Sequence, residues 1–353
     1  MSDVVSGAGG FAGRALVREL AALGRNVTAW CRTRAHEREL FELGAHDVRV
    51  FDLASDAAHE HAQQRELGRE LERSAPQRVF HLAALASPRA CEAEPRLAHT
   101  INVDATRRLL GAVARGTHVV YVSSAAVYAP SARPLAENSA LGPRGVYAAT
   151  KLAGEELAQS AAANGAHVVI ARPFNHAGPG QATEYALPSF VRRLVRFREN
   201  GGAIEVGDLD AVRDFMHVRD TVRAYTRIEA CAPSGAVVNV CSGRASRMHD
   251  LFDGLARRIL GADGVQAARR ALTVSPRLAE APSARASAPR TQCEASSCGS
   301  STDEPSGSTV PAVSSLVGNP YRLATLPFAP LFGLDELLDG LVEEAGGAVA
   351  KPR

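Results

Sequence analysis

A tyrosine and a lysine stand four residues apart in the string YAATK, as Tyr147 and Lys151. On a helix this spacing places both side chains on one face. A phenol with its usual pKa of about 10 is a poor proton donor at neutral pH, and a neighbouring ammonium is expected to lower the pKa of Tyr147. Ser124 ends the apolar run THVVYVSS. It is expected to form a hydrogen bond with the substrate oxygen to which Tyr147 would transfer its proton. The three residues predict proton transfer to or from a substrate oxygen.

Three glycines near the start of the chain, Gly7, Gly10 and Gly13, form the string GAGGFAG together with Phe11. They follow a short apolar stretch and open a segment with helical apolar spacing, ALVRELAALG. Without a Cβ atom the backbone turns tightly and approaches a pyrophosphate closely, while the helix N-terminus supplies unpaired N–H groups. A glycine triplet alone is a weak signal, but its place between a strand and a helix predicts a dinucleotide site.

The residues that follow the apolar run at 26–30 indicate whether the dinucleotide is NAD or NADP. In the string WCRTR, Cys31 stands where a carboxylate would bind the adenine ribose of NAD, and Arg32 and Arg34 follow it. Losing a carboxylate and gaining guanidinium groups favours a 2′-phosphate, so NADP is expected and NAD is less favoured. The alternative is that both arginines are solvated loop residues.

Two further pairs of residues are expected to line the dinucleotide. Asp52 and Leu53, at the end of the third strand, would lie beside the adenine and its ribose. Ala83 and Ala84, after the fourth strand, would leave room where the dinucleotide crosses the sheet.

Several polar residues beside these motifs favour packing roles. His81 lies in an apolar strand, where a packed neutral imidazole is the expected state, and Tyr128 has no lysine four residues on. Asn102 is expected to be structural, whereas His176 could touch a substrate. No spacing of His, Cys and Asp suggests zinc, so no metal is expected.

These residues must be positioned by alternating strands and helices. Such an alternation, with Val- and Ile-rich strands, predicts an α/β fold: a Rossmann-type doubly wound parallel sheet, with a smaller C-terminal α/β substrate domain. Sheets of this kind bind ligands at the carboxyl ends of their strands. The strands are expected at 26–30, 47–53, 78–84, 117–124 and 166–173, and the helices around 60–73, 99–114, 148–164, 188–199 and 218–229.

The rhythm of the sequence changes after about residue 175 and suggests two domains. Residues 1–174 are expected to form the dinucleotide-binding domain, with 211–242 returning to it. Residues 175–210 and 243–353 would form the substrate domain. Within it, 281–309 are rich in Ser, Ala and Pro, and such a tract buries too little apolar surface to offset its ordering entropy. We expect a mobile insert there, with a substrate lid as the alternative.

The overall composition excludes some classes of protein. Lys and Arg number 40 and Asp and Glu 38, a net charge of +2, which argues against a protein that mainly binds nucleic acid or coats an anionic membrane. No run of about 18 apolar residues predicts a membrane span, and the start MSDVVSGAGG is unlike a signal peptide. Six cysteines without a CxxC pair are expected to be reduced thiols of a cytoplasmic protein.

The strings GAGGFAG, HLAA, SSAAVY and YAATK, in this order, resemble the extended short-chain dehydrogenase/reductase family. Three later strings narrow the resemblance: RPFNHAGPGQ at 172–181, IEVGDLDAVRDFMHVRD at 204–220 and VVNVCSGR at 237–244. They look like the GDP-sugar branch, which holds GDP-mannose 4,6-dehydratases and GDP-6-deoxy-4-ketohexose reductases. A GDP-sugar substrate is therefore implied.

The resemblance implies a role for each matching residue. Ser124, Tyr147 and Lys151 match the catalytic serine, tyrosine and lysine. Asn175 matches an asparagine near the substrate diphosphate, and Arg213 matches an arginine that contacts it. As structural alternatives, Arg213 would pair with Asp214 or Asp220, and Asn175 would stabilise a turn. The family's dimers also imply a homodimer through the helices near 99–114 and 148–164.

The residue at position 126 distinguishes the dehydratases of the branch from its reductases. In the dehydratases a glutamate two residues after the catalytic serine or threonine transfers a proton, whereas this chain has Ala126 there. A reductase needs only hydride delivery and one proton donor. The expected reaction is the NADPH-dependent reduction of the C4 ketone of a GDP-4-keto-6-deoxyhexose to a product of the GDP-rhamnose type. The alternatives are a dehydratase, a nucleotide-sugar epimerase or a catalytically idle NADP-binding protein.

Overall fold

The computed structural model describes residues 2–52, 60–275 and 315–346. Its centre is a sheet of seven strands, in which every neighbouring pair is parallel. This confirms the predicted Rossmann-type fold. Across the sheet the strands are β10 (Val237–Val240), β6 (His167–Pro173), β5 (His118–Val122), β4 (Arg78–His81), β1 (Ser2–Ser6), β2 (Asn26–Cys31) and β3 (Asp47–Val50).

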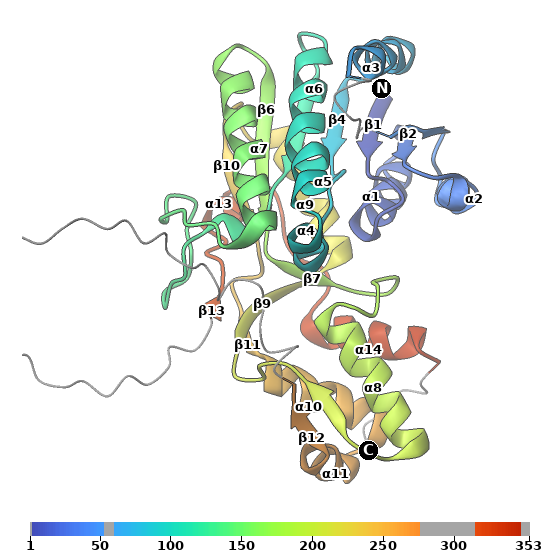
Figure 1. The fold of residues 1–353 in the computed structure, drawn as a ribbon, viewed down its shortest axis with the longest axis vertical. Coiled ribbons are helices and arrows are strands. Elements are labelled where there is room, and N and C mark those ends of the chain that lie inside the picture. Colours follow the sequence, from blue (N-terminus) through green and yellow to red (C-terminus); the bar gives the residue numbers. More distant parts are fainter. Residues whose placement is uncertain (1, 53–59, 276–314, 347–353) are drawn as a thin grey trace, which may run out of the picture.

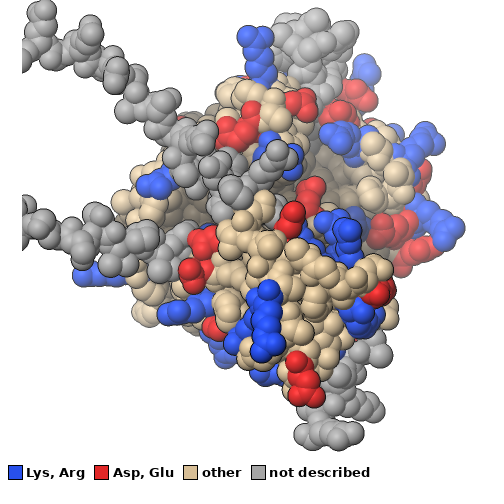
Figure 2. Space-filling view, turned by 60° about the horizontal axis from the view of Figure 1, so that its bottom comes forward, with Lys and Arg blue, Asp and Glu red and all other residues tan. Residues whose placement is uncertain are grey.

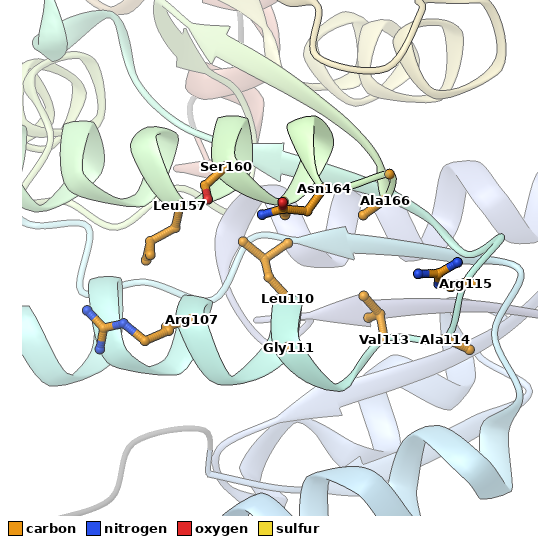
Figure 3. A pocket seen from close by; sticks show the side chains of 12 residues that line it. Arg107, Leu110, Gly111, Val113, Ala114, Arg115, Leu157, Ser160, Asn164 and Ala166 are labelled. Carbon is orange, nitrogen blue, oxygen red and sulfur yellow. The ribbon is translucent and has the colours of Figure 1, made fainter.

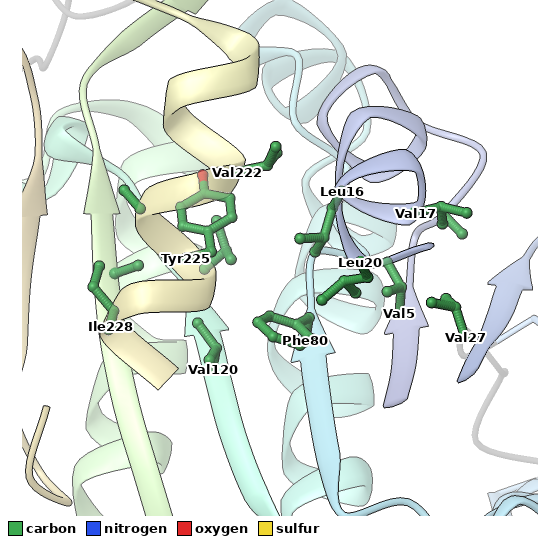
Figure 4. Close-up of a cluster of buried hydrophobic side chains, with 14 of the residues drawn as sticks. Val5, Leu16, Val17, Leu20, Val27, Phe80, Val120, Val222, Tyr225 and Ile228 are labelled. Atoms are coloured by element: carbon green, nitrogen blue, oxygen red, sulfur yellow. The ribbon is translucent and has the colours of Figure 1, made fainter. Parts of the chain in front are cut away.

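Alternate strand residues face two separate hydrophobic cores, because successive side chains of a strand point to opposite faces. Val5, Phe80 and Val120 pack under α1 (Phe11–Ala22) and α9 (Val218–Cys231), the cluster drawn in Figure 4. Their neighbours Val4, Val79 and Val119 belong to the opposite core. That core also takes residues from α3 (Glu60–Ser74), α6 (Ala105–Ala112) and α7 (Gly145–Ala163).

The region expected as one helix over 99–114 is divided in the structure. The helix α5 (Pro95–His99) leads into a π-helical turn, η2 (Thr100–Asp104), and then into α6. Asn102 in this turn donates to Thr150 Oγ1 over 2.9 Å and accepts from the Leu85 backbone over 2.7 Å. Asn102 is therefore structural, as expected. The other short elements are η1 (Arg34–His36) and α2 (Glu37–Glu42), which follow β2, and α4 (Pro88–Ala93) and η3 (Ala125–Val127).

A second group of elements lies beyond the carboxyl ends of the main strands (Figure 1). It contains two small sheets: β11 (Ala245–Arg247), β9 (Val212–His217), β13 (Ser315–Leu316) and β7 (Asn175–Ala177) in one, β8 (Ile204–Val206) and β12 (Leu272–Val274) in the other. The helices of this group are α8 (Ala186–Asn200), α10 (Met248–Leu260), α11 (Gly264–Arg270) and α14 (Leu334–Glu344), whereas α13 (Tyr321–Thr325) packs beside β10 in the main core. Most of this group shares its own apolar core, in which Phe190 and Phe252 meet edge to face with centroids 5.4 Å apart.

The segment 211–242 contributes to both groups. Its helix α9 and strand β10 pack with the main sheet, whereas β9 pairs with β7, β11 and β13. The division into two domains stays a prediction, and the tract 281–309 lies outside the described residues.

Two further observations concern possible partners. Among the described residues, no helix is long and apolar enough to cross a bilayer. Figure 2 shows basic and acidic side chains interspersed over one face of the molecule, with no single basic patch there.

Candidate active site

The glycine loop between β1 and α1 is as tight as the sequence predicts. Gly7 has φ +71°, and a Cβ atom added there would lie 2.7 Å from the Ala83 backbone nitrogen. A Cβ on Gly13 would collide with the Gly7 carbonyl oxygen. Gly10 is the N-cap of α1, and no side chain caps the helix. The open N–H groups of its first turn fit a pyrophosphate.

The end of β2 presents cationic side chains. Cys31 is buried, while Arg32 and Arg34 are exposed and pair with no carboxylate in the described part of the chain. The exposed Asp52 follows the third strand, which ends at Val50 rather than at the expected residue 53. Leu53 lies outside the described residues, and its role stays a prediction.

The residues Ser124, Tyr147 and Lys151 come together after β5 and on the first turns of α7. A hydrogen bond joins Ser124 and Tyr147, and Ser124 Oγ accepts from the Ala126 backbone over 3.2 Å. Lys151 Nζ donates to the Val122 carbonyl over 2.5 Å and lies 4.9 Å from the centroid of the Tyr121 ring. The last residue of β5 thus helps to position the lysine.

The predicted lowering of the tyrosine pKa is wrong in this structure. Burial raises the pKa of Tyr147 to about 12, and the hydrogen bond from Ser124 opposes this only in part. Burial also lowers the pKa of Lys151 to about 8, opposed by the charge of Glu155. Loss of solvation is the largest cause, and the only lowering contribution comes from Ser124 and not from the charge of Lys151. Tyr147 is therefore protonated at neutral pH and suited to donate a proton.

A buried ion pair supports the lysine from one helical turn away. Arg172 donates to both carboxylate oxygens of Glu155, over 2.9 and 2.6 Å. Ser123 Oγ donates to the same carboxylate over 2.5 Å. All three residues are buried, so the carboxylate is fixed by hydrogen bonds rather than solvated.

Two further polar residues, one in β4 and one directly after η3, pack as expected. The His81 ring lies between Ser6 Oγ, at 2.7 Å, and Thr106 Oγ1, at 2.9 Å, and burial lowers the pKa of His81 to about 3. Tyr128 donates to Asn239 Oδ1 over 2.6 Å. Both residues are held by packing and hydrogen bonds within the protein.

The residues expected to bind substrate lie on adjacent strands beyond the main sheet. Asn175 Nδ2 donates to the Asp214 carbonyl over 3.4 Å, and Arg213 is the residue before Asp214 in β9. Burial lowers the pKa of the Arg213 guanidinium, with Asp208 opposing. The Asp214 carboxylate accepts from the Ser242 side chain over 2.6 Å and from the backbone nitrogens of residues 242, 243 and 318.

Sequence reasoning missed two contacts between the glycine loop and the segment 175–181. The rings of Phe11 and His176 stack with centroids 6.0 Å apart and planes 2° apart. Arg14, directly after the third glycine, donates to the Gly180 carbonyl over 3.1 Å. The only sequence feature that could have indicated the contact with Gly180 is the basic residue directly after the third glycine.

A hollow of about 330 Å³ lies elsewhere, between α6 and α7 (Figure 3). Its lining includes Arg107, Leu110, Arg115, Leu157 and Asn164. None of the predicted site residues lines it.

Two known proteins are similar in sequence to this chain. The chain is 38% identical over 190 residues to the GDP-6-deoxy-D-mannose reductase of Pseudomonas aeruginosa, a match that spans 51% of this chain and 62% of that protein. The GDP-6-deoxy-D-talose 4-dehydrogenase of Aggregatibacter actinomycetemcomitans is 24% identical over 257 residues, 71% of this chain and 78% of that protein.

Solved structures match almost the whole chain. The structure of RMD from Pseudomonas aeruginosa complexed with NADPH is 26% identical, with a TM-score of 0.72 over 97% of this chain and 98% of that chain. The structure of MoeE5 in complex with UDP-glucose and NAD is 28% identical, with a TM-score of 0.73 over 98% and 99%. A family model described as the NAD dependent epimerase/dehydratase family matches residues 4–241. With its resemblance to the extended short-chain dehydrogenases/reductases confirmed, this chain belongs to the NAD dependent epimerase/dehydratase family.

Proposed function

We propose that the protein reduces the C4 ketone of a GDP-4-keto-6-deoxyhexose with NADPH, giving a GDP-6-deoxyhexose of the rhamnose type. The observation that carries this proposal is the side-chain contact of Tyr147 with Ser124, whose Oγ also accepts from the backbone of Ala126, a residue with no acid-base group. The name of the Pseudomonas aeruginosa relative, a GDP-6-deoxy-D-mannose reductase, supports the substrate class.

The glycine loop and the end of β2 would hold the cofactor. Gly7, Gly10 and Gly13, with the Phe11 backbone, would take the pyrophosphate at the N-terminus of α1. Arg32 and Arg34 would take a 2′-phosphate, which favours NADP over NAD. Asp52, Leu53, Ala83 and Ala84 would line the adenosine and the crossing of the sheet. NADPH supplies the hydride when it is bound.

The side chains of the chain itself would handle the proton. Tyr147 donates its phenolic proton to the C4 oxygen as negative charge develops there. Ser124, already bonded to Tyr147, orients that oxygen. Lys151, fixed by the Val122 carbonyl, would hold the nicotinamide ribose and would favour the phenolate that remains.

The same site favours a reductase over a dehydratase. Elimination of water needs a further acid-base group, and losing such a group typically lowers a rate by about 10²–10⁴-fold. The methyl group of Ala126 transfers no proton. Its backbone nitrogen lies 3.2 Å from Ser124 Oγ, so the position that carries a glutamate in the dehydratases adjoins the catalytic serine.

The diphosphate of the substrate would be bound by Arg213 and Asn175. Both side chains extend from β9 and β7, strands paired in the small mixed sheet. A guanidinium and an amide are suited to phosphate oxygens.

The proposal is tested by incubating the purified protein with GDP-4-keto-6-deoxymannose and NADPH, and in parallel with NADH. We expect one NADPH oxidised per sugar reduced, slower use of NADH, and a 6-deoxyhexose product identified by NMR. An epimerase would interconvert sugars without net oxidation of NADPH. Binding of NADPH without binding of GDP would instead indicate an idle NADP-binding protein.

Two properties complete the proposal. We expect a homodimer in which α6 and α7 pair with their copies, as the resemblance to the family's dimers implies. Light scattering that returns a monomer mass would refute this. The free thiols of Cys31, Cys91, Cys231 and Cys241 support a reducing compartment such as the cytoplasm.

A further inference from the structure

The first turn of α1 has two faces with different partners. Its backbone N–H groups are the open donors expected to bind the cofactor, whereas the side chains of Phe11 and Arg14 both contact the segment 175–181. Residues three apart on a helix lie on the same face. One turn of helix therefore touches both ligand sites at once.

Arg14 joins three segments through one rigid guanidinium. Its Nη1 donates to the Gly9 carbonyl in the glycine loop over 2.7 Å, and its Nη2 donates to the Gly180 carbonyl over 3.1 Å. Its Nε lies 3.0 Å from the carboxylate of Glu39 on α2. Because the guanidinium is planar and its donors are fixed in direction, a shift of the Gly9 peptide is transmitted to Gly180.

The segment on the other side of Arg14 carries the expected substrate residue Asn175 and the adjoining His176. Gly180 has φ +86°, and its backbone N–H donates to Glu344 on α14 over 2.6 Å. The Gly180 residue is thus held from one side by Arg14 and from the other by Glu344. Within a glycine-rich turn, two side chains fix the path of the backbone.

We propose that Arg14 is a positioning residue that couples the cofactor site to the substrate segment 175–181. Binding of a dinucleotide diphosphate orders Gly9 and the first turn of α1, and through Arg14 this restricts the segment that carries Asn175. A nucleotide sugar then meets a segment that is already ordered and loses less conformational entropy on binding. The identity of that second ligand rests on the function proposed above, but the coupling itself does not.

The test measures hydrogen–deuterium exchange of the peptides that cover residues 175–181, with and without saturating NADP⁺ and, in parallel, NAD⁺. The variants are Arg14→Met, which removes all three polar contacts, and Arg14→Lys, which keeps a charge and donors. The matched control is Arg18→Met, because Arg18 is exposed one turn further along α1 and makes none of these contacts. Melting temperatures verify that each variant is folded.

In the wild type and in Arg18→Met we expect the cofactor to slow exchange over 175–181 by about fivefold or more, since couplings of this kind are commonly about 5–150-fold. Arg14→Met should lose this protection while the glycine loop itself is still protected, and Arg14→Lys should restore part of it. Equal protection in Arg14→Met and wild type overturns the proposal, as does an unprotected segment in the wild type. If Arg14→Met does not fold, the test relies on Arg14→Lys. A lysine lacks the planar set of donors, so the cofactor-induced protection of residues 175–181 should be lower in this variant than in the wild type.

Calorimetry with GDP distinguishes this inference from the proposed function. GDP should bind the wild type about fivefold or more tightly when NADP⁺ is present, and this factor should approach one in Arg14→Met. Failure of GDP to bind would refute the GDP-sugar assignment, and the exchange experiment would still decide the role of Arg14.

Discussion

The two halves of the candidate site are built differently. The proton-transfer side, made of Ser124, Tyr147 and Lys151, comes from the end of one strand and the first turns of one helix. The proposed nucleotide-sugar side, made of Asn175 and Arg213, depends on segments far apart in the chain. The Asp214 carboxylate beside Arg213 binds backbone groups of residues 242, 243 and 318.

Because of this difference, we expect amino-acid substitutions to have different effects in the two halves. On the proton-transfer side a substitution acts on the chemistry, since the scaffold of β5 and α7 belongs to the main core. On the nucleotide-sugar side a substitution acts first on the arrangement of strands and only then on binding. Mutations can separate the two cases.

The largest expected effect is that of Tyr147→Phe. Removing the proton donor should lower kcat by about 10²–10⁴-fold while NADPH binding is retained. The measurement is single-turnover reduction of the ketosugar together with NADPH fluorescence.

Tyr128→Phe is the matched control, because the Tyr128 phenol bonds to Asn239 and Arg172 and lies outside the proposed proton-transfer residues. It should cost about 1 kcal/mol of stability and leave kcat near the wild-type value. Similar losses of kcat in both variants would argue against a special role for Tyr147.

A smaller effect is expected from Asp214→Asn on the nucleotide-sugar side. An amide presents a donor to backbone N–H groups that need an acceptor, which should cost about 1–3 kcal/mol of unfolding free energy. The KM for the nucleotide sugar should rise by about tenfold as the strand β9 that carries Arg213 loses its links to residues 242, 243 and 318, with NADPH affinity unchanged. Chemical denaturation and steady-state kinetics measure both effects.

Asp210→Asn serves as the control for this variant, because Asp210 is exposed four residues before Asp214. It should behave like the wild type. An Asp214→Asn protein with normal stability and normal KM would show that the nucleotide-sugar side does not depend on this network.

An effect on affinity of similar size, without loss of stability, is expected from pH. The pKa of Lys151 is lowered to about 8, so the ammonium is present below that pH and is lost as the pH rises through it. NADPH affinity should therefore fall by about tenfold between pH 7 and pH 9. Lys151→Arg, which stays charged, should flatten the profile measured by fluorescence titration. An equally steep profile in that variant would assign the titration to another group.

The main sheet was predictable because strand patterns are local. Valine-rich runs and a glycine loop indicate parallel strands wherever they occur, so β2, β4, β5 and β6 lie close to the expected ranges. Their ends were less predictable: β3 stops at Val50, and the helix expected over 99–114 contains a π-helical turn that Asn102 occupies.

The contacts of the site were less predictable than its residues. The spacing of Tyr147 and Lys151 indicated that they share a helix face, but not that desolvation would raise the tyrosine pKa to about 12. Burial depends on packing by distant segments, which no local pattern contains. The contact of Arg14 with Gly180 joins residues 166 positions apart and is invisible for the same reason.

The ion pair of Glu155 and Arg172 limits how this sequence can diverge. Replacing one member leaves an unpaired charge in the interior, which typically lowers the stability of the fold by about 3–5 kcal/mol. Replacing both with apolar groups often leaves the stability unchanged. Because Ser123 also donates to Glu155, an apolar replacement would strand its hydroxyl as well. Relatives that lack one of these three residues should therefore lack the others, so the trio would be gained or lost as a unit.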